Sequence, residues 1–265
     1  MLLASGSGRA VAAGGDVHGM VKSISSGRPA DSELYLRSEY QFYHMMNTLP
    51  IPSVTLMPQI CMGGGLGFCH STTIRVASER TRMAMPESKI GIFADVGAGY
   101  FLNQLQVNGA AKWLGLTSRH IFGAATVQLG LATHLVPFER HAELGELLLL
   151  SGSFTEVEEI VDSMAIDVPE MEPELMNTIG FYDAAELGDI IERLKTAGLS
   201  DELALFDQVC PMGAAVTNAN LNRAKGKSLA DVFKQEFRAM RYQQRDCNFI
   251  EGVRALLGKF VAVTK

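Results

Sequence analysis

Two glycine-containing turns near the start of the sequence have features that suit the binding of an oxyanion. Residues 63–65 are all glycine, follow an apolar run and precede a helical pattern. At such a junction glycine permits close backbone approach, and the free N–H groups of the first helical turn lie at the positive end of the helix dipole. Gly14 and Gly15 open a second helical segment, which Asp16 is suited to cap.

These turns favour chemistry in which a carbonyl oxygen becomes negatively charged. Either turn alone is also compatible with a plain structural role. Together they can supply two backbone N–H donors, which a thioester carbonyl needs when it becomes an enolate or a tetrahedral oxyanion. The sequence therefore predicts a two-donor oxyanion site.

None of the glycine clusters completes a nucleotide-binding motif. The clusters at residues 6–8, 63–67 and 97–99 lack the last glycine of GxGxxG. The segment Gly226-Lys227-Ser228 resembles the end of a Walker A loop, but the position of its first glycine is occupied by Leu221 and no strand pattern precedes it. We therefore reject a Rossmann fold and a P-loop, and we expect a turn that leads into a helix.

Composition excludes several classes of protein. With 265 residues and 47% apolar content the chain can bury a substantial core, which excludes a disordered protein. A net charge of −6 provides no general attraction to phosphate backbones, so nucleic acid is not an expected ligand. The six histidines have no spacing typical of metal ligands, and no metal site is expected.

The compartment is only weakly indicated by the sequence. Four cysteines without a CxxC pair suit a reducing environment better than a disulfide framework: Cys61, Cys69, Cys210 and Cys247. The start of the chain shows no targeting segment, and its longest apolar stretches are shorter than a membrane span. No membrane partner is expected.

Alternating apolar runs, glycine turns and helical patterns predict an α/β core over residues 1–151 and a helical region over residues 152–265. Strands are expected near residues 2–4, 53–56, 74–77 and 82–84. In the core, helices are expected near residues 31–48, 65–71, 96–105 and 141–150. In the helical region, helix starts are expected at Thr155, Asp183 and Ser228. The last of these helices carries Val232, Phe233, Phe237 and Met240 on one side, so it should pack against the core.

Four sequence blocks resemble, in order and spacing, those of the crotonase superfamily. They read AGGDV at 13–17, MGGGLG at 62–67, AMPE at 84–87 and GIFADVGAGYF at 91–101. The last block and NFIEGVRA at 248–255 resemble the 3-hydroxyisobutyryl-CoA hydrolase branch in particular. The resemblance covers nearly the whole chain and implies a ClpP/crotonase-like α/β core.

The resemblance also implies site residues. The family's oxyanion hole corresponds to the N–H groups of Gly15 and Gly64. Enoyl-CoA hydratases use two glutamates, and the matching positions are Gly67, which has no side chain, and Glu87. The hydrolase branch instead pairs the Pro-Glu glutamate, Glu87, with an aspartate that corresponds to Asp95.

A further acid of the hydrolase branch corresponds to Glu39. Hydrolysis of a thioester needs a nucleophile or an activated water, and burial raises the pKa of a carboxyl enough for that role. Glu87 is therefore expected either to attack the carbonyl, which forms an anhydride, or to deprotonate water. Asp95 is expected to orient water or a substrate hydroxyl, with capping of a helix at Val96 as the alternative. Glu39 would shape the acyl end of the pocket, or else be a solvated helix residue.

The sequence departs from the pattern of the hydrolase branch at several positions. Ala94 occupies a position where the pattern usually has proline, Ala98 one where it has glycine, and Asn248 one where it has aspartate. The family normally has further strands and a helix before the position of Leu2, and the resemblance implies that these N-terminal strands are missing. Either the sheet is completed by other means, or residues 2–4 form an exposed edge strand that pairs with another chain, as in a homo-oligomer. The chain is therefore expected to associate or to bind coenzyme A weakly.

The resemblance implies hydrolysis of a short-chain 3-hydroxyacyl-CoA thioester of the 3-hydroxyisobutyryl-CoA type, as in mitochondrial valine catabolism. Coenzyme A would be part of the acyl-CoA substrate, with no permanently bound cofactor. One alternative is an enoyl-CoA hydratase or isomerase that uses Glu87 alone. Another is a non-catalytic structural subunit of a mitochondrial ribosome, the one case in which contact with nucleic acid would be expected.

Overall fold

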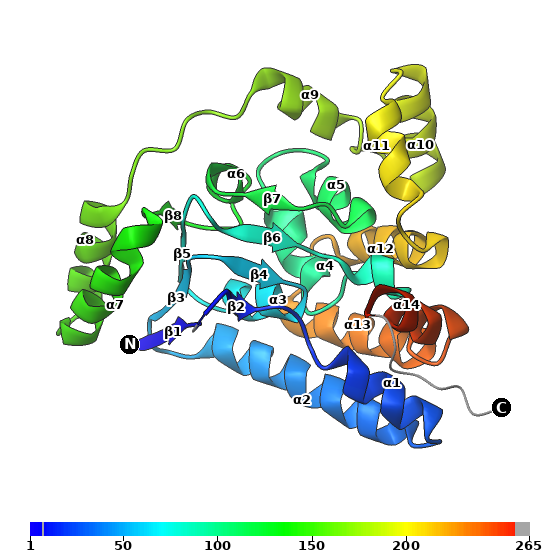
Figure 1. Ribbon diagram of the computed structural model, residues 1–265, viewed down its shortest axis with the longest axis horizontal. Helices are drawn as coiled ribbons and strands as arrows, with labels where there is room; N and C mark the ends of the chain where they lie inside the picture. The colour runs from blue at the N-terminus through cyan, green and yellow to red at the C-terminus, as the bar shows by residue number, and fades with distance from the viewer. Residues whose placement is uncertain (7, 258–265) are drawn as a thin grey trace.

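The computed structural model describes residues 1–6 and 8–257, which form two four-stranded sheets surrounded by helices (Figure 1). The first sheet has the order β1-β3-β5-β8 and is parallel throughout. Its strands are β1 (Leu2–Ser5), β3 (Ser53–Met57), β5 (Ile74–Ala77) and β8 (His134–Leu135). The second sheet has the order β2-β4-β6-β7, with only β7 antiparallel. Its strands are β2 (Ala10–Ala12), β4 (Ile60–Met62), β6 (Arg82–Ala84) and β7 (Ile121–Phe122).

The first six strands alternate between the two sheets: β1, β3 and β5 belong to the first sheet, and β2, β4 and β6 belong to the second. The four strands expected from the sequence are confirmed as β1, β3, β5 and β6. Every residue of β3 is buried, as is typical of a parallel strand covered on both faces. Within the described residues β1 pairs with β3 alone, so it is an edge strand as expected.

Helices of the α/β core cover the sheets. They are α1 (Val17–Ser25), α2 (Pro29–Thr48), α3 (Gly64–His70), α4 (Ala98–Phe101), α5 (Ala110–Thr117), α6 (Ala124–Gln128) and α7 (His141–Leu150), with 3-10 turns η1 (Glu87–Ile90), η2 (Leu102–Gln104) and η3 (Phe138–Arg140). The helix expected at 96–105 begins two residues late and ends as a 3-10 turn. The cause is local: Val96 and Gly97 have φ angles of 53° and 87°, which no α-helix contains.

After residue 151 the described residues form helices and no strand. These helices are α8 (Phe154–Met164), α9 (Pro173–Gly180), α10 (Leu187–Thr196), α11 (Ser200–Phe206), α12 (Pro211–Ala224), α13 (Leu229–Gln243) and α14 (Cys247–Leu257). Ser228 is confirmed as a cap, since its side chain accepts from the N–H of Asp231. The start at Thr155 is wrong because Ser153 caps α8, and the start at Asp183 is wrong because its N–H closes a turn onto Gly180 and α10 begins at Leu187.

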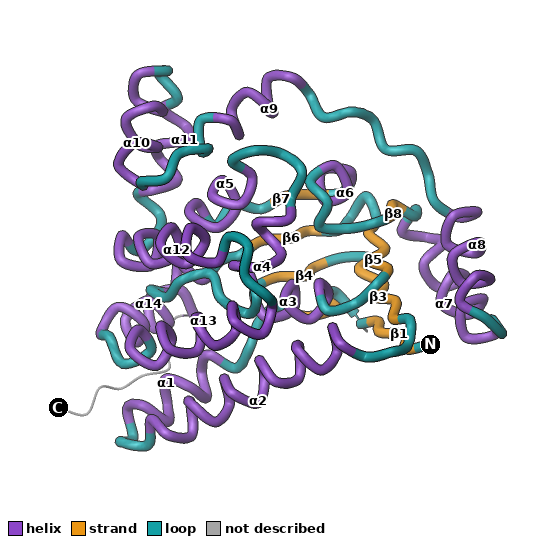
Figure 2. Tube along the Cα trace, turned by 180° about the vertical axis from the view of Figure 1, so that it is seen from behind, coloured by secondary structure: helices purple, strands orange, loops and turns teal. Residues whose placement is uncertain are grey.

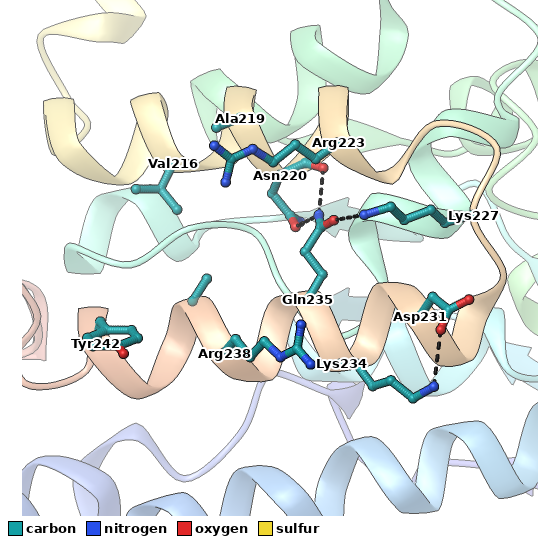
Figure 3. A pocket seen from close by; sticks show the side chains of 11 residues that line it. Val216, Ala219, Asn220, Arg223, Lys227, Asp231, Lys234, Gln235, Arg238 and Tyr242 are labelled. Carbon is teal, nitrogen blue, oxygen red and sulfur yellow. Dashed lines mark hydrogen bonds and ion pairs between the residues drawn. The ribbon is translucent and has the colours of Figure 1, made fainter.

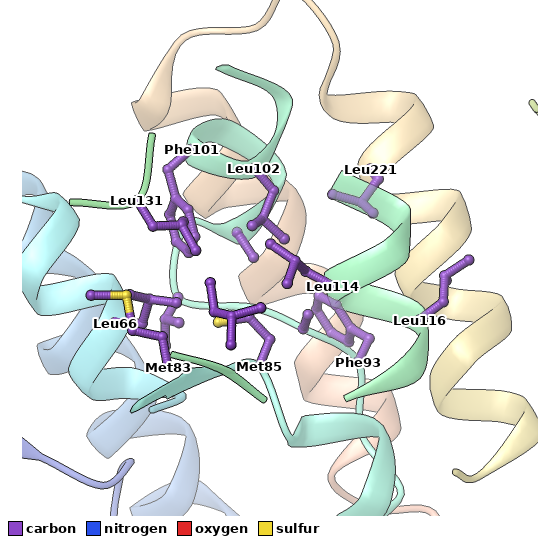
Figure 4. Packing of buried hydrophobic residues seen from close by; sticks show 14 of the residues in the cluster. Leu66, Met83, Met85, Phe93, Phe101, Leu102, Leu114, Leu116, Leu131 and Leu221 are labelled. Carbon is purple, nitrogen blue, oxygen red and sulfur yellow. The ribbon is translucent and has the colours of Figure 1, made fainter. Parts of the chain in front are cut away.

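The main hydrophobic core joins the two parts of the chain. Figure 4 shows Leu221 of α12 beside side chains of the α/β core such as Leu102 and Leu114. Helix α13 lies along α2, and α14 lies against α1 and η1 (Figure 2). The boundary near residue 151 stays a prediction, because these last helices share one core with the sheets.

Val232, Phe233 and Met240 of α13 are buried, as the pattern predicted. None of the described helices is both long and apolar enough to cross a membrane.

Candidate active site

The two glycine turns and the three predicted carboxyl groups line one cavity of about 280 Å³. The turn with Gly15 follows β2, the turn with Gly64 follows β4, and Glu87 follows β6. These three strands are adjacent and parallel, so their carboxyl ends reach the same edge of the sheet. The order of the strands therefore brings together residues that are far apart in sequence, at the edge where α/β proteins commonly bind ligands.

The two predicted N–H donors lie close together. A Cβ placed on Gly64 would be 3.3 Å from the Gly15 nitrogen. None of the hydrogen bonds among the described residues has the Gly15 or Gly64 N–H as its donor. Gly63 and Gly14, which precede the two donors, adopt φ angles of 54° and 109°, which glycine tolerates. The arrangement can hold an oxyanion.

The turn at Gly15 is fixed from both sides. Asp16 caps α1 as predicted, because its Oδ1 accepts from the Gly19 N–H at 2.8 Å. The Asp16 N–H in turn donates to the Tyr35 hydroxyl on α2 at 3.0 Å. A side chain at residue 15 would displace the same hydroxyl, since its Cβ would lie 2.5 Å from it.

Glu87 is buried, with 5% of its surface exposed, beside the Gly64 turn. A Cβ on Gly63 would lie 2.9 Å from Glu87 Oε1, and Glu87 Oε2 has no hydrogen-bond partner among the described residues. Burial raises the pKa of Glu87 to about 8, and the charges of Glu39 and Glu236 add to the effect. The carboxyl group therefore has one oxygen without a hydrogen-bond partner and an unusually high pKa.

Asp95 is also 5% exposed, and its carboxylate accepts a hydrogen bond from the Tyr40 hydroxyl on α2. Burial, and next the charge of Glu87, holds its pKa well above the ordinary range, while the bond from Tyr40 lowers it. The alternative that Asp95 caps a helix is wrong. Gly97 is the N-cap of α4, and Asp95 contributes only its main-chain oxygen, to the Ala98 N–H at 2.8 Å.

Glu39 lies on α2 and lines the cavity, so the alternative of a solvated helix residue is wrong. Its Oε1 accepts from the Tyr43 hydroxyl at 2.9 Å and from the Tyr35 hydroxyl at 3.4 Å. Burial raises its pKa, and the two tyrosines oppose the shift. A Cβ on Gly64 would lie 2.9 Å from Glu39 Oε1, which puts this carboxyl beside the paired N–H donors.

Sequence reasoning missed the three tyrosines of α2. Tyr35, Glu39 and Tyr43 follow each other at intervals of four residues, the spacing that puts side chains on one face of a helix. That spacing was the available signal. Tyr40, which holds Asp95, lies one position away and is buried against Phe233 of α13. Its role could not be read from spacing because its partner is 55 residues away in sequence.

A larger cavity, of about 770 Å³, lies elsewhere between α12 and α13 (Figure 3). Its lining includes four basic residues, Arg223, Lys227, Lys234 and Arg238. It includes none of the active-site residues predicted from the sequence. Among the described residues, no group of three or more His, Cys, Asp or Glu side chains could hold a metal ion. The smaller cavity is lined by the three predicted carboxyl groups and by the two glycine turns.

Comparison with known proteins identifies the family of the chain. A family model described as enoyl-CoA hydratase/isomerase matches residues 1–259. The chain belongs to this family. A curated relative from Gallus gallus, "3-hydroxyisobutyryl-CoA hydrolase, mitochondrial", is 32% identical over 97% of the chain and 70% of its own length.

Two further relatives show the breadth of the enoyl-CoA hydratase/isomerase family. A protein of Schizosaccharomyces pombe named "Small ribosomal subunit protein mS47" is 31% identical over 97% of the chain and 63% of its own length. A crystal structure of a carnitinyl-CoA dehydratase from Mycobacterium thermoresistibile has a TM-score of 0.88 and 29% identity, and the match covers 97% of the chain and 76% of that protein. The crotonase-like fold expected from the sequence is confirmed.

Proposed function

We propose that the protein hydrolyses a short-chain 3-hydroxyacyl-CoA thioester of the 3-hydroxyisobutyryl-CoA type. The observation that carries the proposal is the position of Glu87, a buried carboxyl group with an unpaired oxygen beside two unpaired backbone N–H groups. The similarity to the avian hydrolase supports the choice of acyl group. Coenzyme A takes part only as a portion of the substrate.

In the proposed reaction the thioester oxygen accepts hydrogen bonds from the N–H groups of Gly15 and Gly64. Attack on the carbonyl carbon moves an electron pair onto this oxygen, and the two donors stabilise the resulting oxyanion. When the tetrahedral species collapses, the carbon–sulfur bond breaks and the coenzyme A thiolate leaves, to be protonated to the thiol. The donors act mainly on the transition state because charge develops there.

Glu87 serves the attack by one of two routes. As a base it takes a proton from water, and the hydroxide becomes part of the free acid. As a nucleophile it forms a mixed anhydride that water then hydrolyses. Both routes need the deprotonated carboxylate. Asp95, held by Tyr40, would orient the water or the 3-hydroxyl group, and Glu39 would shape the acyl end of the cavity.

The second candidate is a non-catalytic subunit, which the similarity to the fission yeast ribosomal protein favours. A hydratase is less well supported, since Gly67 has no side chain at the position of the second hydratase glutamate. The curated hydrolase relatives are named as mitochondrial, and we propose the same compartment and a role in valine breakdown for this protein. Assembly into a homo-oligomer remains a proposal.

The proposal is tested by following thiol release from 3-hydroxyisobutyryl-CoA with the purified protein. We expect thiol release by the unmodified protein, and loss of it in Glu87→Gln. Product analysis with the unsaturated thioester distinguishes hydration from hydrolysis. Absence of thiol release from saturated and hydroxylated thioesters alike would reject the hydrolase, and the absence of hydration of the unsaturated thioester as well would leave the structural subunit.

A further inference from the structure

Glu236 of α13 is fully buried, yet it is not one of the residues that line the cavity. Its Oε2 accepts a hydrogen bond from the Gly97 N–H at 2.7 Å, and its Oε1 accepts one from the Gly99 N–H at 3.0 Å. A third bond, also 3.0 Å, comes from Asn220 Nδ2 on α12. The three donors fix the position of the buried carboxylate, because each hydrogen bond constrains it in a different direction.

The main chain that Glu236 holds begins directly after Asp95. Val96 has a φ angle of 53°, a conformation that is strained for a β-branched residue, and Gly97 follows with a φ angle of 87°. Such strain persists only where the surrounding structure holds it, and it is found most often at functional sites. The two N–H groups bonded to Glu236 lie just beyond the strained residue, where they can hold the turn in place.

Further bonds from α12 and α13 hold the main chain on the other side of Asp95. Gln243 Oε1 accepts from the Phe93 N–H at 3.0 Å, and Thr217 Oγ1 accepts from the Ala94 N–H at 3.0 Å. Asn220 is itself held by Gln235, whose Nε2 donates to Asn220 Oδ1 at 2.7 Å (Figure 3). Glu236 is the only charged group among these acceptors and the one that contacts the strained turn.

The charge of Glu236 also reaches the site. Burial raises its pKa to about 7, and the three donors oppose that shift because they favour the ionised form. Its negative charge contributes to the raised pKa of both Glu87 and Asp95. Glu39, Tyr40 and Tyr43 on α2 are further titratable groups that interact with Asp95.

We propose that Glu236 is a positioning residue for the reaction, which holds the turn at residues 96–99 and thereby sets the place of the Asp95 carboxyl group in the cavity. The inference rests on the proposed function as far as turnover is concerned. Its geometric part, the holding of the turn, stands on the hydrogen bonds alone. Because Glu236 does not line the cavity, it should affect the rate of the chemical step more than the binding of substrate.

The test compares Glu236→Gln with the unmodified protein. Glutamine matches the shape but cannot accept all three bonds, so we expect kcat to fall at least tenfold with KM changed less than threefold. Peptides covering residues 93–101 should exchange amide hydrogen severalfold faster. The midpoint of the pH–rate profile should move to lower pH, because a negative charge near Glu87 and Asp95 is removed. Glu236→Asp, which keeps a carboxylate but shortens its reach, should recover part of kcat.

Glu202→Gln is the matched control. Glu202 is a mostly buried carboxylate on α11 that accepts from the Tyr182 hydroxyl at 2.6 Å and pairs with Arg119, and it does not line the cavity. It should lose stability without a change in kcat or in exchange at residues 93–101. If Glu236→Gln does not fold, Asn220→Ala removes one of the three donors and should show the same changes on a smaller scale.

The outcomes separate the two proposals. Unchanged exchange at residues 93–101 in a folded variant overturns the inference, and so does a rise in KM with kcat unchanged. If the unmodified protein releases no thiol, the proposed function fails, while hydrogen exchange still decides whether Glu236 holds the turn.

Discussion

The carbonyl oxygen of Val96 lies 2.6 Å from the point that a Cβ on Gly67 would occupy. Further atoms of Val96, its Cβ and Cγ2, would lie 2.8 and 2.9 Å from the same point. The space in which a hydratase would hold a second glutamate is therefore filled by the turn that follows Asp95. The packing of Val96 against Gly67 therefore leaves no space for a carboxyl side chain at position 67, and it involves the same turn that follows the Asp95 carboxyl group.

A first prediction concerns this contact. Gly67→Ala should destabilise the protein by about 1–3 kcal/mol, because overpacking at a backbone contact forces the turn to shift. Gly188→Ala is the control, since a Cβ there meets nothing within 4 Å, and it should be neutral or slightly stabilising. Urea denaturation measures both. Equal stability of the two variants would show that the contact at Gly67 relaxes without cost.

The second prediction concerns Glu87. Glu87→Gln keeps the shape of the side chain and removes its basicity, so thioester hydrolysis should fall by at least roughly a hundredfold. Binding of coenzyme A esters, measured by calorimetry, should survive. Glu143→Gln, which changes an exposed residue of α7, should leave turnover unaltered. Retention of more than a tenth of the activity in Glu87→Gln would remove Glu87 from the reaction.

The raised pKa of Glu87 predicts how stability depends on pH. Its pKa is about 8 in the folded protein, against an ordinary value of 4.5, which we take for the unfolded chain. Between pH 4.5 and about 8 the folded protein therefore binds a proton that the unfolded chain has released. The free energy of unfolding should therefore fall as pH rises from 4.5 to about 8, by about 1.4 kcal/mol per pH unit for this group. Urea denaturation at several pH values should show a shallower fall in Glu87→Gln. Identical slopes would contradict the shift.

Turnover should depend on pH in the opposite sense to stability, because Glu87 acts as the deprotonated carboxylate. The rate should rise with pH and level off above about 8. The deprotonated carboxylate of Glu87, which is the form that reacts, is therefore also the form in which the folded protein is less stable.

A further prediction concerns Asp95 and the tyrosine that donates to it, Tyr40. Asp95→Asn should lower turnover, because asparagine removes the carboxylate that accepts from the Tyr40 hydroxyl in the cavity. Tyr40→Phe removes the donor that lowers the pKa of Asp95, so that pKa should rise further and turnover at neutral pH should fall. NMR titration of the carboxyl carbons follows the shift. An unchanged Asp95 pKa in Tyr40→Phe would show that the hydrogen bond has no role in placing its charge.

The last prediction concerns the oxyanion donors. Gly64→Pro removes one N–H group and should abolish turnover, a loss of about 3 kcal/mol or more in transition-state stabilisation. Gly64→Ala keeps the N–H group but places a methyl 2.9 Å from Glu39 Oε1, so it should lower turnover less. The comparison of kcat/KM in the two variants measures the donor itself. Full activity of Gly64→Pro would remove Gly64 from the site.

Local patterns in the sequence were enough to predict much of the fold. The apolar runs of β3, β5 and β6, the capping of α1 by Asp16 and the cap of α13 at Ser228 were all readable, because short-range sterics and hydrogen bonds decide them. The two glycine turns were readable for the same reason. The resemblance to the family then pointed to Glu87 and Asp95.

Tertiary structure alone decided how these residues meet. Parallel pairing of β2, β4 and β6 brings Gly15, Gly64 and Glu87 to one edge, and no local pattern specifies which strands pair. The role of Asp95 was open in the sequence, since an aspartate before a helical pattern is an ordinary cap. That Asp95 does not cap a helix was decided by the left-handed turn at Val96, after which α4 begins only at Ala98. Glu236, which accepts from the Gly97 N–H in this turn, is 139 residues further along the chain. Contacts at that separation depend on how packed elements fit together, which a pattern of neighbouring residues does not record.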